Sequence, residues 1–189
     1  MRAQITLASS RRRKPGLKPE LKDALRPVPH YERAVREVSK LFSKAGIRHA
    51  LVGALGANAY RDRPRTTEDI VFFVGDEAFD RHAGGLVTMR VPVVEFDGID
   101  VDQVPLTEAL RGVEAGLDHP HFSEGVPIAP VEVIVSMKLL AGRTQDLADV
   151  EAILASGADL ELLRAAVQKA APDHVQTLER LIGNAQRGR

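Results

Sequence analysis

Carboxylates on two short apolar segments are the first residues of this chain whose types and spacing could do chemistry. In "RPRTTEDIVFFV" an acidic pair ending in Asp69 opens a hydrophobic run, and in "IDVDQV" Asp100 and Asp102 stand two apart. Side chains alternate along a strand, so Asp100 and Asp102 should share one face, as should Asp69 and Val71. Carboxylate oxygens suit Mg²⁺, which indicates metal chemistry. The alternative is that these acids only face solvent, as charges on edge strands do.

A glycine turn between a predicted strand and a predicted helix could bring backbone amides to a ligand. The segment "HALVGALGANAY" starts as a strand and turns at Gly53-Ala54 into a run of small residues that should be helical to about Tyr60. A glycine lets backbone N–H groups approach a ligand closely, and a helix N-terminus attracts phosphate. By itself this signal is weak, because small residues at such a turn usually serve packing.

Charged residues also meet where two predicted helices join, in "KLLAGRTQDLADVEAIL". Lys138 and Arg143 flank the helix end, and Asp146 and Asp149 stand three apart on one face of the next helix. One interpretation is a solvated pair of helices joined by salt bridges. The other is a cation that holds phosphate charge together with an acid that orients it.

Hydrophobic periodicity predicts the elements that must position these residues. A helix with Ala34, Val38, Leu41 and Phe42 on one stripe should end at Gly46. Further elements are expected as strands at 50–52, 69–74 and on both sides of the Asp97-Gly98 turn, short helices at 76–85 and 107–116, and a loop at 118–130. The pattern after residue 130 is helical, with breaks at Gly142, Ser156-Gly157 and Pro172.

The chain divides into three predicted regions. Residues 1–28 mix a basic run with Pro and Gly and should form a flexible tail. Residues 29–128 should form an α/β core, and residues 129–186 a helical region packed on it. A length of 189 residues suits one domain with a small appendage.

Composition excludes several classes of protein. There is no cysteine, so disulfides and thiolate metal sites are excluded. The 26 Lys and Arg balance 26 Asp and Glu, and only 4% of residues are aromatic, which argues against a generally basic or base-stacking nucleic-acid binder. No apolar run approaches the roughly 20 residues of a membrane helix, and the N-terminal charges follow a weakly apolar stretch, the reverse of a secretory signal. We therefore expect a cytoplasmic protein with no membrane partner.

In their order along the chain, these pieces resemble a known family. "LVGALGANAYRDRPRTTEDI", with the apolar strand after it, looks like the opening of a small bacterial nucleotidyltransferase of the polymerase-beta superfamily. The resemblance is nearest to the branch of AbiEii-type abortive-infection toxins and their uncharacterised relatives. That branch has a hydrophobic-Gly-small turn, a short helix, an Arg-containing loop, Asp-x-Asp leading a strand, and a third carboxylate on a later strand, as in "VDQVP" here. "KLLAGRTQDLADVEAIL" is similar to its Lys-containing helix and Arg–Asp–Asp segment.

The resemblance spans Arg48 to Leu154 and implies a minimal nucleotidyltransferase fold. In that α/β (α+β) fold a mixed β-sheet with flanking helices is followed by a C-terminal helical bundle. Asp69 would be the first metal-binding aspartate and a catalytic residue. Asp102 would be the third carboxylate, which binds metal and helps to activate the attacking group.

The remaining roles implied by the resemblance concern the nucleotide. Gly53 and Ala54 would form the phosphate-facing turn, and Lys138 would hold phosphate charge. The far wall of the pocket would be shaped by Arg143 and Asp146, and the loop residue Arg65 could reach the nucleotide. The chemistry implied is in-line attack on the α-phosphate of a nucleoside triphosphate (NTP), assisted by two Mg²⁺ ions.

The chain departs from this pattern at Val71, where the family has its second aspartate. That aspartate normally bridges both ions, and valine has no lone pair to ligate. Three explanations stay open: a natural pseudoenzyme that keeps the fold, an inactivated variant, or compensation by another acid. Asp100 is the better candidate metal ligand for compensation, because Glu68 should point to the opposite face. We expect impaired or absent two-metal catalysis, with one Mg²⁺ or none when no nucleotide is bound.

Three functions follow from these patterns. The first is transfer of NMP from an NTP to an RNA, protein or small-molecule acceptor; the resemblance alone adds a toxin–antitoxin setting, with tRNA as acceptor and an antitoxin partner. The second is a catalytically impaired protein that binds nucleotide or a partner and regulates. The third, a helical interaction module at 131–184, fits the α/β half least.

A second, unrelated metal site is conceivable at "DHPHF". His119 and His121 form a His-x-His pair that could bind a transition metal. The predicted loop supplies no third ligand nearby, so a surface loop is the preferred interpretation.

Overall fold

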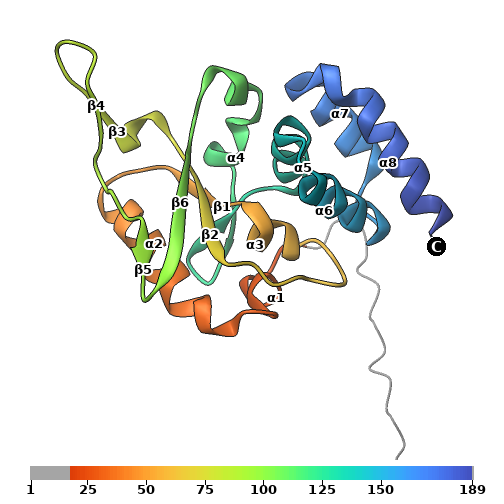
Figure 1. Cartoon of the computed structure of the whole chain (residues 1–189), viewed down its shortest axis with the longest axis horizontal. Coiled ribbons are helices and arrows are strands. Elements are labelled where there is room, and N and C mark those ends of the chain that lie inside the picture. Colours follow the sequence, from red (N-terminus) through yellow and green to blue (C-terminus); the bar gives the residue numbers. More distant parts are fainter. Residues whose placement is uncertain (1–17, 189) are drawn as a thin grey trace, which may run out of the picture.

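A six-stranded mixed β-sheet lies at the centre of the molecule (Figure 1), of which the computed structural model describes residues 18–188. Its strand order is β5-β6-β2-β1-β8-β7. The bounds are β1 His49–Leu51, β2 Asp69–Val74, β5 Glu95–Phe96, β6 Ile99–Pro105, β7 His121–Ser123 and β8 Val126–Ile128. β2 runs parallel to β6 and β1 parallel to β8, whereas the β1–β2, β5–β6 and β7–β8 pairs are antiparallel. β3 (Phe79–Arg81) and β4 (Val87–Met89) form a separate hairpin.

N-terminal helices contribute a core on one side of the sheet. They are α1 (Leu21–Leu25), the 3₁₀ helix η1 (Pro29–Tyr31) and α2 (Glu32–Lys44). The apolar stripe of α2, with Val38 and Phe42, packs in one cluster with Ile70 and Phe72 of β2. Because side chains alternate along β2, the neighbouring Phe73 belongs to a different cluster.

That second cluster joins the sheet to the C-terminal helices, which gather on the other side of the sheet in Figure 1. Phe73 shares it with Leu139, Ile153 and Leu163. The remaining helices are α3 Gly53–Asn58, η2 Asp76–Ala78, η3 Glu108–Val113, α4 Ala115–Asp118, α5 Val131–Ala141, α6 Thr144–Ala155, α7 Leu160–Ala170, η4 Pro172–His174 and α8 Val175–Arg187. The sheet therefore has a core on each face.

The predicted fold class is confirmed: the protein is mixed α/β, with a mixed sheet flanked by helices and followed by C-terminal helices. The helices α5 and α6 end at Gly142 and beside Gly157, which have φ of 65° and 90°, and α7 is separated from α8 by η4, which begins at Pro172. Asp97 and Gly98, both with positive φ, form the predicted two-residue turn between β5 and β6. None of the helices within residues 18–188 has the length and apolar character needed to cross a bilayer.

Part of the predicted flexible tail is folded. Within residues 18–28, α1 buries Leu21, Ala24 and Leu25, and Val28 follows them into the core. The prediction was wrong there because a helix of five residues is too short to show periodicity. The rest of the predicted tail, residues 1–17, lies outside the described residues.

Two other expectations need correction, both at very short strands. The helix expected at 76–85 is the single turn η2 followed by β3, and Gly84 and Gly85, each with φ of 85°, lie in the hairpin loop. The loop expected at 118–130 contains the end of α4 and then β7 and β8, joined at Glu124 and Gly125. A strand of three residues is too short for an alternating pattern of apolar and polar residues to be recognised.

One residue of the predicted apolar stripe of α2 is also corrected. Leu41 is 39% exposed and does not belong to the buried stripe.

Candidate functional site

Residues that the sequence singled out line a common cleft between the sheet and helices α5 and α6. Its inner cavity, of about 430 Å³, includes in its lining Gly53, Asp69, Val71, Asp102, Lys138, Arg143 and Asp146. An outer groove of about 1000 Å³ shares Asp69, Asp102, Arg143 and Asp146 with the inner cavity and adds Arg65 and Asp100. Four segments that are far apart in sequence therefore converge at this place.

The carboxylates stand on neighbouring parallel strands, β2 and β6. Asp69 is paired in register with Asp100, and Val71 with Asp102. Paired residues of adjacent strands lie side by side, about 4.8 Å apart, with their side chains on the same face. Asp102 therefore has Val71 beside it and Asp69 diagonally across, and the position that would complete a three-carboxylate row holds valine.

A chain of hydrogen bonds holds Asp69 in place. The hydroxyl of Thr67 donates to Oδ1 of Asp69, and the phenol of Tyr31 donates to the carbonyl oxygen of Thr67 at 3.1 Å. Tyr31 is buried at the end of η1, so the N-terminal helices support the loop that leads into β2. Burial raises the pKa of Tyr31, and the negative charge of Asp69 raises it further.

Val71 is packed directly on the glycine turn. Gly53 has φ of 63°, and a Cβ added there would lie 2.8 Å from Cγ2 of Val71. The backbone N–H of Val52 also donates to the carbonyl oxygen of Val71 at 2.9 Å. The predicted partner of Gly53 in the turn, Ala54, is 94% buried and is absent from the lining of both the inner cavity and the outer groove. Of the two turn residues, only Gly53 faces the cleft.

The donors for a metal ion fall short of a two-ion site. No group of three or more His, Asp or Glu side chains within residues 18–188 is arranged to hold a metal. Asp69 and Asp102 line both parts of the cleft, whereas Asp100 lines only the outer groove. Magnesium is commonly held by one or two carboxylates together with substrate phosphates, so this pair fits one ion that arrives with a nucleotide. The two-ion arrangement does not fit, because Val71 offers no oxygen to bridge the ions.

The cations of the site are tied into a network that we call the Asp149 cluster: Arg61, Arg65, Lys138, Arg143, Asp146 and Asp149. Asp149, whose side chain is fully buried, accepts from Arg61 at 2.6 Å and from Lys138 at 2.7 Å. Arg65 binds both oxygens of this carboxylate, at 2.9 and 3.0 Å. Lys138 also donates to Asp146 at 3.0 Å.

The cluster keeps its carboxylates ionised. Burial would raise the pKa of Asp149, but hydrogen bonds from Arg65 and Lys138 outweigh it and bring this pKa well below its usual range. The pKa of Asp146 is lowered in the same way, by Arg143 and Lys138 against burial. Four cations face two carboxylates, which leaves the cluster with excess positive charge beside Asp69 and Asp102.

Because of this network, the ammonium of Lys138 is less available to a ligand than that of an unpaired lysine. Its side chain is only 7% exposed, and its ammonium already donates to Asp146 and Asp149. The side chain of Arg143, in contrast, is 78% exposed and donates to Asp146 through Nε alone at 2.7 Å. The terminal nitrogens of Arg143 have no partner in the described part of the chain, so they are the better placed to meet an anion.

Two members of the cluster were not predicted as site residues. The sequence pattern distinguishes Asp149 only by its spacing from Asp146, and it assigns no role to Arg61. The signal for Arg61 was weak, because one arginine among three in a loop says nothing about a partner 88 residues away. The apolar stripe of α6 could have located Asp149, since a carboxylate on the buried face of a helix needs a cation.

Comparison with known proteins shows only distant likeness. No protein-family model matches the chain, and no curated protein matches it. Among solved structures, an antigenic nucleotidyltransferase-like protein from Paracoccidioides brasiliensis is similar over 81% of this chain and 94% of its own, with 15% sequence identity and a TM-score of 0.46. A likeness this distant assigns no ligand, residue role or activity, and no comparison supports the narrower resemblance to the AbiEii branch.

Proposed function

We propose that this chain is a nucleotidyltransferase-like protein whose cleft takes a Mg²⁺–NTP complex, and that Val71 leaves it impaired in NMP transfer. The observation that carries the proposal is the lining of the inner cavity. It gathers Gly53, Asp69 and Asp102 from separate segments of the chain, together with three members of the Asp149 cluster, Lys138, Arg143 and Asp146. These are residues to which the sequence resemblance assigns roles at a nucleotide site.

Asp69 and Asp102 would hold the single ion together with phosphate oxygens of the nucleotide. When bound, Mg²⁺ would neutralise phosphate charge and polarise the reacting phosphate. Asp69 is oriented for this task before a ligand arrives, because Thr67 occupies its Oδ1.

The protein's own cations would complete the site. Arg143, exposed at the rim and only partly paired, would contact phosphate oxygens. Lys138 would act indirectly, since its charge fixes Asp146 and Asp149. Asp102, an exposed residue of β6, would accept a proton from the attacking group of an RNA, protein or small-molecule acceptor.

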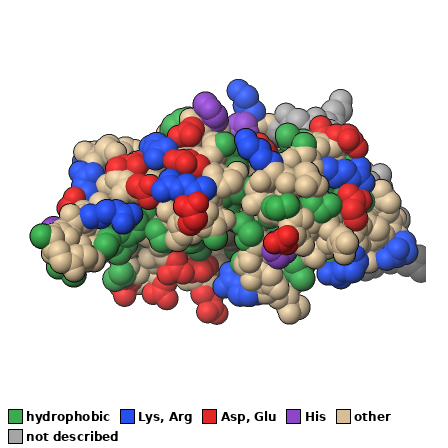
Figure 2. Space-filling view, turned by 90° about the horizontal axis from the view of Figure 1, so that it is seen from above, with side chains coloured by type: hydrophobic (Ala, Val, Ile, Leu, Met, Phe, Trp, Pro, Cys, Tyr) green, Lys and Arg blue, Asp and Glu red, His purple; other side chains and the backbone are tan. Residues whose placement is uncertain are grey.

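The packing of Val71 on Gly53 favours a second function, a regulatory protein that binds the nucleotide and transfers nothing. A toxin–antitoxin setting with a tRNA acceptor would be compatible with either function and rests on resemblance alone. Figure 2 shows acidic and basic side chains interspersed over one face of the molecule, so RNA would have to be held by a local contact.

Binding is tested first, with non-hydrolysable ATP, GTP, CTP and UTP analogues and Mg²⁺ in calorimetry. Asp69→Ala and Asp102→Ala should each weaken binding by at least about tenfold, or about 1.4 kcal/mol. Glu68→Ala is the matched control, because Glu68 adjoins Asp69 but lines only the outer groove. Equal binding by all four proteins, or none by the unmodified chain with any analogue, would refute the nucleotide site.

Transfer is tested with NTPs labelled at the α-phosphate, in the presence of Mg²⁺ and total RNA. Val71→Asp should increase label transfer over the unmodified protein, because it restores a carboxylate between Asp69 and Asp102. Val71→Asn, of the same size but uncharged, should not, and Asp69→Ala should abolish the gain. Strong transfer by the unmodified protein that is lost in Asp69→Ala would show that catalysis survives valine at this position.

A further inference from the structure

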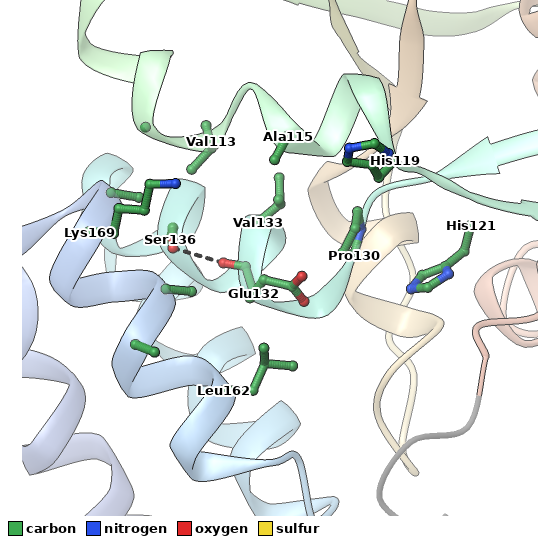
Figure 3. Close-up of a pocket in the computed structure, with 14 residues that line it drawn as sticks. Val113, Ala115, His119, His121, Pro130, Glu132, Val133, Ser136, Leu162 and Lys169 are labelled. Atoms are coloured by element: carbon green, nitrogen blue, oxygen red, sulfur yellow. Dashed lines mark hydrogen bonds between the residues drawn. The ribbon is translucent and has the colours of Figure 1, made fainter.

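A second cavity, of about 530 Å³, lies on the side of α5 opposite the cleft (Figure 3). Helix α5 separates the two: Met137 and Lys138 line the cleft, whereas Glu132, Val133 and Ser136 line the second cavity. Its other walls come from η3, α4, the start of β7 and α7. We call it the α5–α7 cavity, and the proposed function makes no use of it.

The walls of the α5–α7 cavity are apolar. Val113, Val133 and Leu162 contribute the larger surfaces, and the remaining wall residues include four alanines of α4 and α7. Leu162 is 44% exposed, so the chain leaves part of this apolar surface uncovered. A cavity of this size with apolar walls is typical of small-molecule sites, which add a few well-placed polar groups for orientation.

Two opposite charges supply such groups. Neither the carboxylate of Glu132 nor the ammonium of Lys169 has an ion pair or a hydrogen-bond partner elsewhere in residues 18–188, although both line the cavity. On the same helix as Lys169, Arg164 binds both Glu161 and Glu179. Glu132 and Lys169 have no such partners, so both can meet a ligand.

Figure 3 shows how these charges are placed. Lys169 lies at one end of the cavity, and the carboxylate of Glu132 is directed towards the other end, where His119 and His121 lie. Val133 lies between the two charged groups in this view. A ligand that spans the cavity thus meets a cation, an apolar surface and then a carboxylate on the side where the two imidazoles lie.

Metal binding does not explain this arrangement. His119, His121 and Glu132 line one cavity, so a third potential ligand is nearer than the sequence indicated. The three are nevertheless not placed to hold an ion together, as no such group occurs in the described chain. The carboxylate is better matched by an ammonium group, which donates hydrogen bonds and carries the opposite charge.

We propose that the α5–α7 cavity binds a small zwitterionic amphiphile with an ammonium group at one end and a carboxylate at the other. The ammonium binds Glu132 at the end of the cavity where the two histidines lie, and the carboxylate binds Lys169. The apolar middle covers Val113, Val133 and Leu162. A ligand with one charge would leave the opposite protein charge unpaired.

The test uses ω-amino acids as probes, because their two charges are joined by an apolar chain of chosen length. 4-Aminobutyrate, 6-aminohexanoate and 8-aminooctanoate are titrated into the isotopically labelled full chain and followed by NMR amide shifts. Hexanoate and hexylamine each lack one charge. At least one ω-amino acid should bind about fivefold more tightly than either of these, as expected for one partly exposed ion pair. The shifts should centre on residues 131–136 and 162–170.

Charge-removing variants assign each end of the ligand. Glu132→Gln should abolish the preference for the ω-amino acid over hexanoate, because the ammonium then has no partner. Lys169→Met should abolish the preference over hexylamine for the corresponding reason. Lys44→Met, at an exposed position of α2 outside this cavity, is the matched control and should leave both preferences unchanged.

A cavity-filling variant tests the location. Ala166→Leu should abolish binding of every probe, whereas Ala148→Leu, at an exposed position of α6, should leave it unchanged. Thermal unfolding verifies that both variants are folded. The proposal is overturned if no probe binds, if singly charged probes bind as tightly as the zwitterions, or if the shifts centre on the cleft. These outcomes do not depend on nucleotide binding, so the two proposals fail separately.

Discussion

Val71 links the acidic strands and the glycine turn of the candidate site. It is paired in register with Asp102, and its side chain rests on Gly53. An aspartate there would place a third carboxylate in the row, whereas valine fills the same place with methyl groups. Residue 53 has a positive φ, and a Cβ added to it would overlap Val71, so this packing of the turn against the strand requires glycine.

The free-energy cost of placing a side chain against Val71 can be measured by comparing Gly53 with Gly46, which has no such neighbour. Gly53→Ala should destabilise the protein by about 2–4 kcal/mol, which combines the cost of φ at 63° with the overlap on Val71. Gly46→Ala isolates the first cost, because Gly46 has φ of 69° and no atom near an added Cβ; about 1–2 kcal/mol is expected there. Urea denaturation supplies both values.

A double-mutant cycle completes this test. In the background of Val71→Ala, the cost of Gly53→Ala should fall towards that of Gly46→Ala, because the overlapping methyl groups are gone. Equal costs of Gly53→Ala in the two backgrounds would show that the turn relaxes around the new side chain.

His49 makes stability depend on pH. Burial lowers the pKa of its ring, which packs between Phe42 and Phe72 and contacts Ser39 at 2.8 Å. A folded-state pKa below the unfolded value of about 6.5 means that the unfolded chain binds the extra proton, so stability should fall as pH falls through 6.5, by up to about 1.4 kcal/mol per pH unit. Urea midpoints at pH 7.5, 6.5 and 5.5 measure this slope.

The residue responsible for that slope can be identified by substitution. His49→Gln, which has no titrating ring, should flatten the slope below pH 6.5. His30→Gln, at an exposed position of η1, should leave it unchanged. If the slope persists in His49→Gln, another group must account for the pH dependence.

At the scale of elements, the Asp149 cluster joins three parts of the chain. Arg61 and Arg65 lie in the loop that leads to β2, Lys138 lies in α5, and Asp149 in α6. The same loop carries Thr67, which orients Asp69. A buried carboxylate in a C-terminal helix thus helps to set the position of the predicted metal ligand on β2.

Asp149→Asn should therefore affect stability and the loop together. The amide keeps the shape of the carboxylate but leaves Arg61 and Arg65 without their counter-charge and Lys138 with Asp146 alone, so a loss of about 3–5 kcal/mol is expected. Arg143→Ala, which removes the pairing of an exposed arginine with Asp146, should cost less than about 1 kcal/mol. Denaturant unfolding compares the two variants.

Hydrogen exchange separates local loosening of the loop from global loss of stability. In Asp149→Asn, amides of residues 61–67 should lose more protection than those of the distant α2. Uniform loss of protection across the chain would show that Asp149 stabilises the fold without a particular role at the loop.

The elements also show what sequence could predict. β2 and β6 have six and seven residues, so alternation predicts that Asp69 shares a face with Val71 and Asp100 shares a face with Asp102. The pairing of β2 with β6, which brings these acids together, is not readable from alternation. β7 and β8 have three residues each, too few for alternation to distinguish them from a loop. The partners of Asp149 were not readable either, because Arg65 is 84 residues away in the sequence and the pairing exists only after folding.

At the scale of the whole molecule, the sheet is the part that both cores share. Ile70 and Phe72 of β2 pack in the core formed with the N-terminal helices, which we call the N-terminal core. Phe73 of the same strand packs in the core formed with the C-terminal helices, the C-terminal core. The sequence predicts an α/β core at 29–128 with a C-terminal helical region at 129–186 packed on it. In the structure, the N-terminal helices and the C-terminal helices pack on opposite faces of the same strand, so neither group can leave without exposing part of β2.

Unfolding should consequently occur in one cooperative step that either core can trigger. Leu21 of α1 is 1% exposed in the N-terminal core, and Leu163 of α7 is fully buried in the C-terminal core. Leu21→Ala and Leu163→Ala should each destabilise the protein by about 2–5 kcal/mol, through lost burial and the cavity left behind. Leu162→Ala, next to Leu163 but 44% exposed, is the matched control and should cost clearly less.

The unfolding midpoints measured with two spectroscopic signals distinguish cores that unfold together from cores that unfold separately. Far-UV circular dichroism reports all helices, whereas the fluorescence of the two tyrosines reports Tyr31, in the N-terminal core, and Tyr60, packed against both cores. If the shared sheet couples the cores, both signals should shift together in Leu21→Ala and in Leu163→Ala, with one midpoint each. If Leu163→Ala produced an early transition in circular dichroism while the tyrosine signal kept its original midpoint, the C-terminal helices would be an independent unit. The cleft would then lie between parts that separate on their own, and its lining would not be fixed by the sheet.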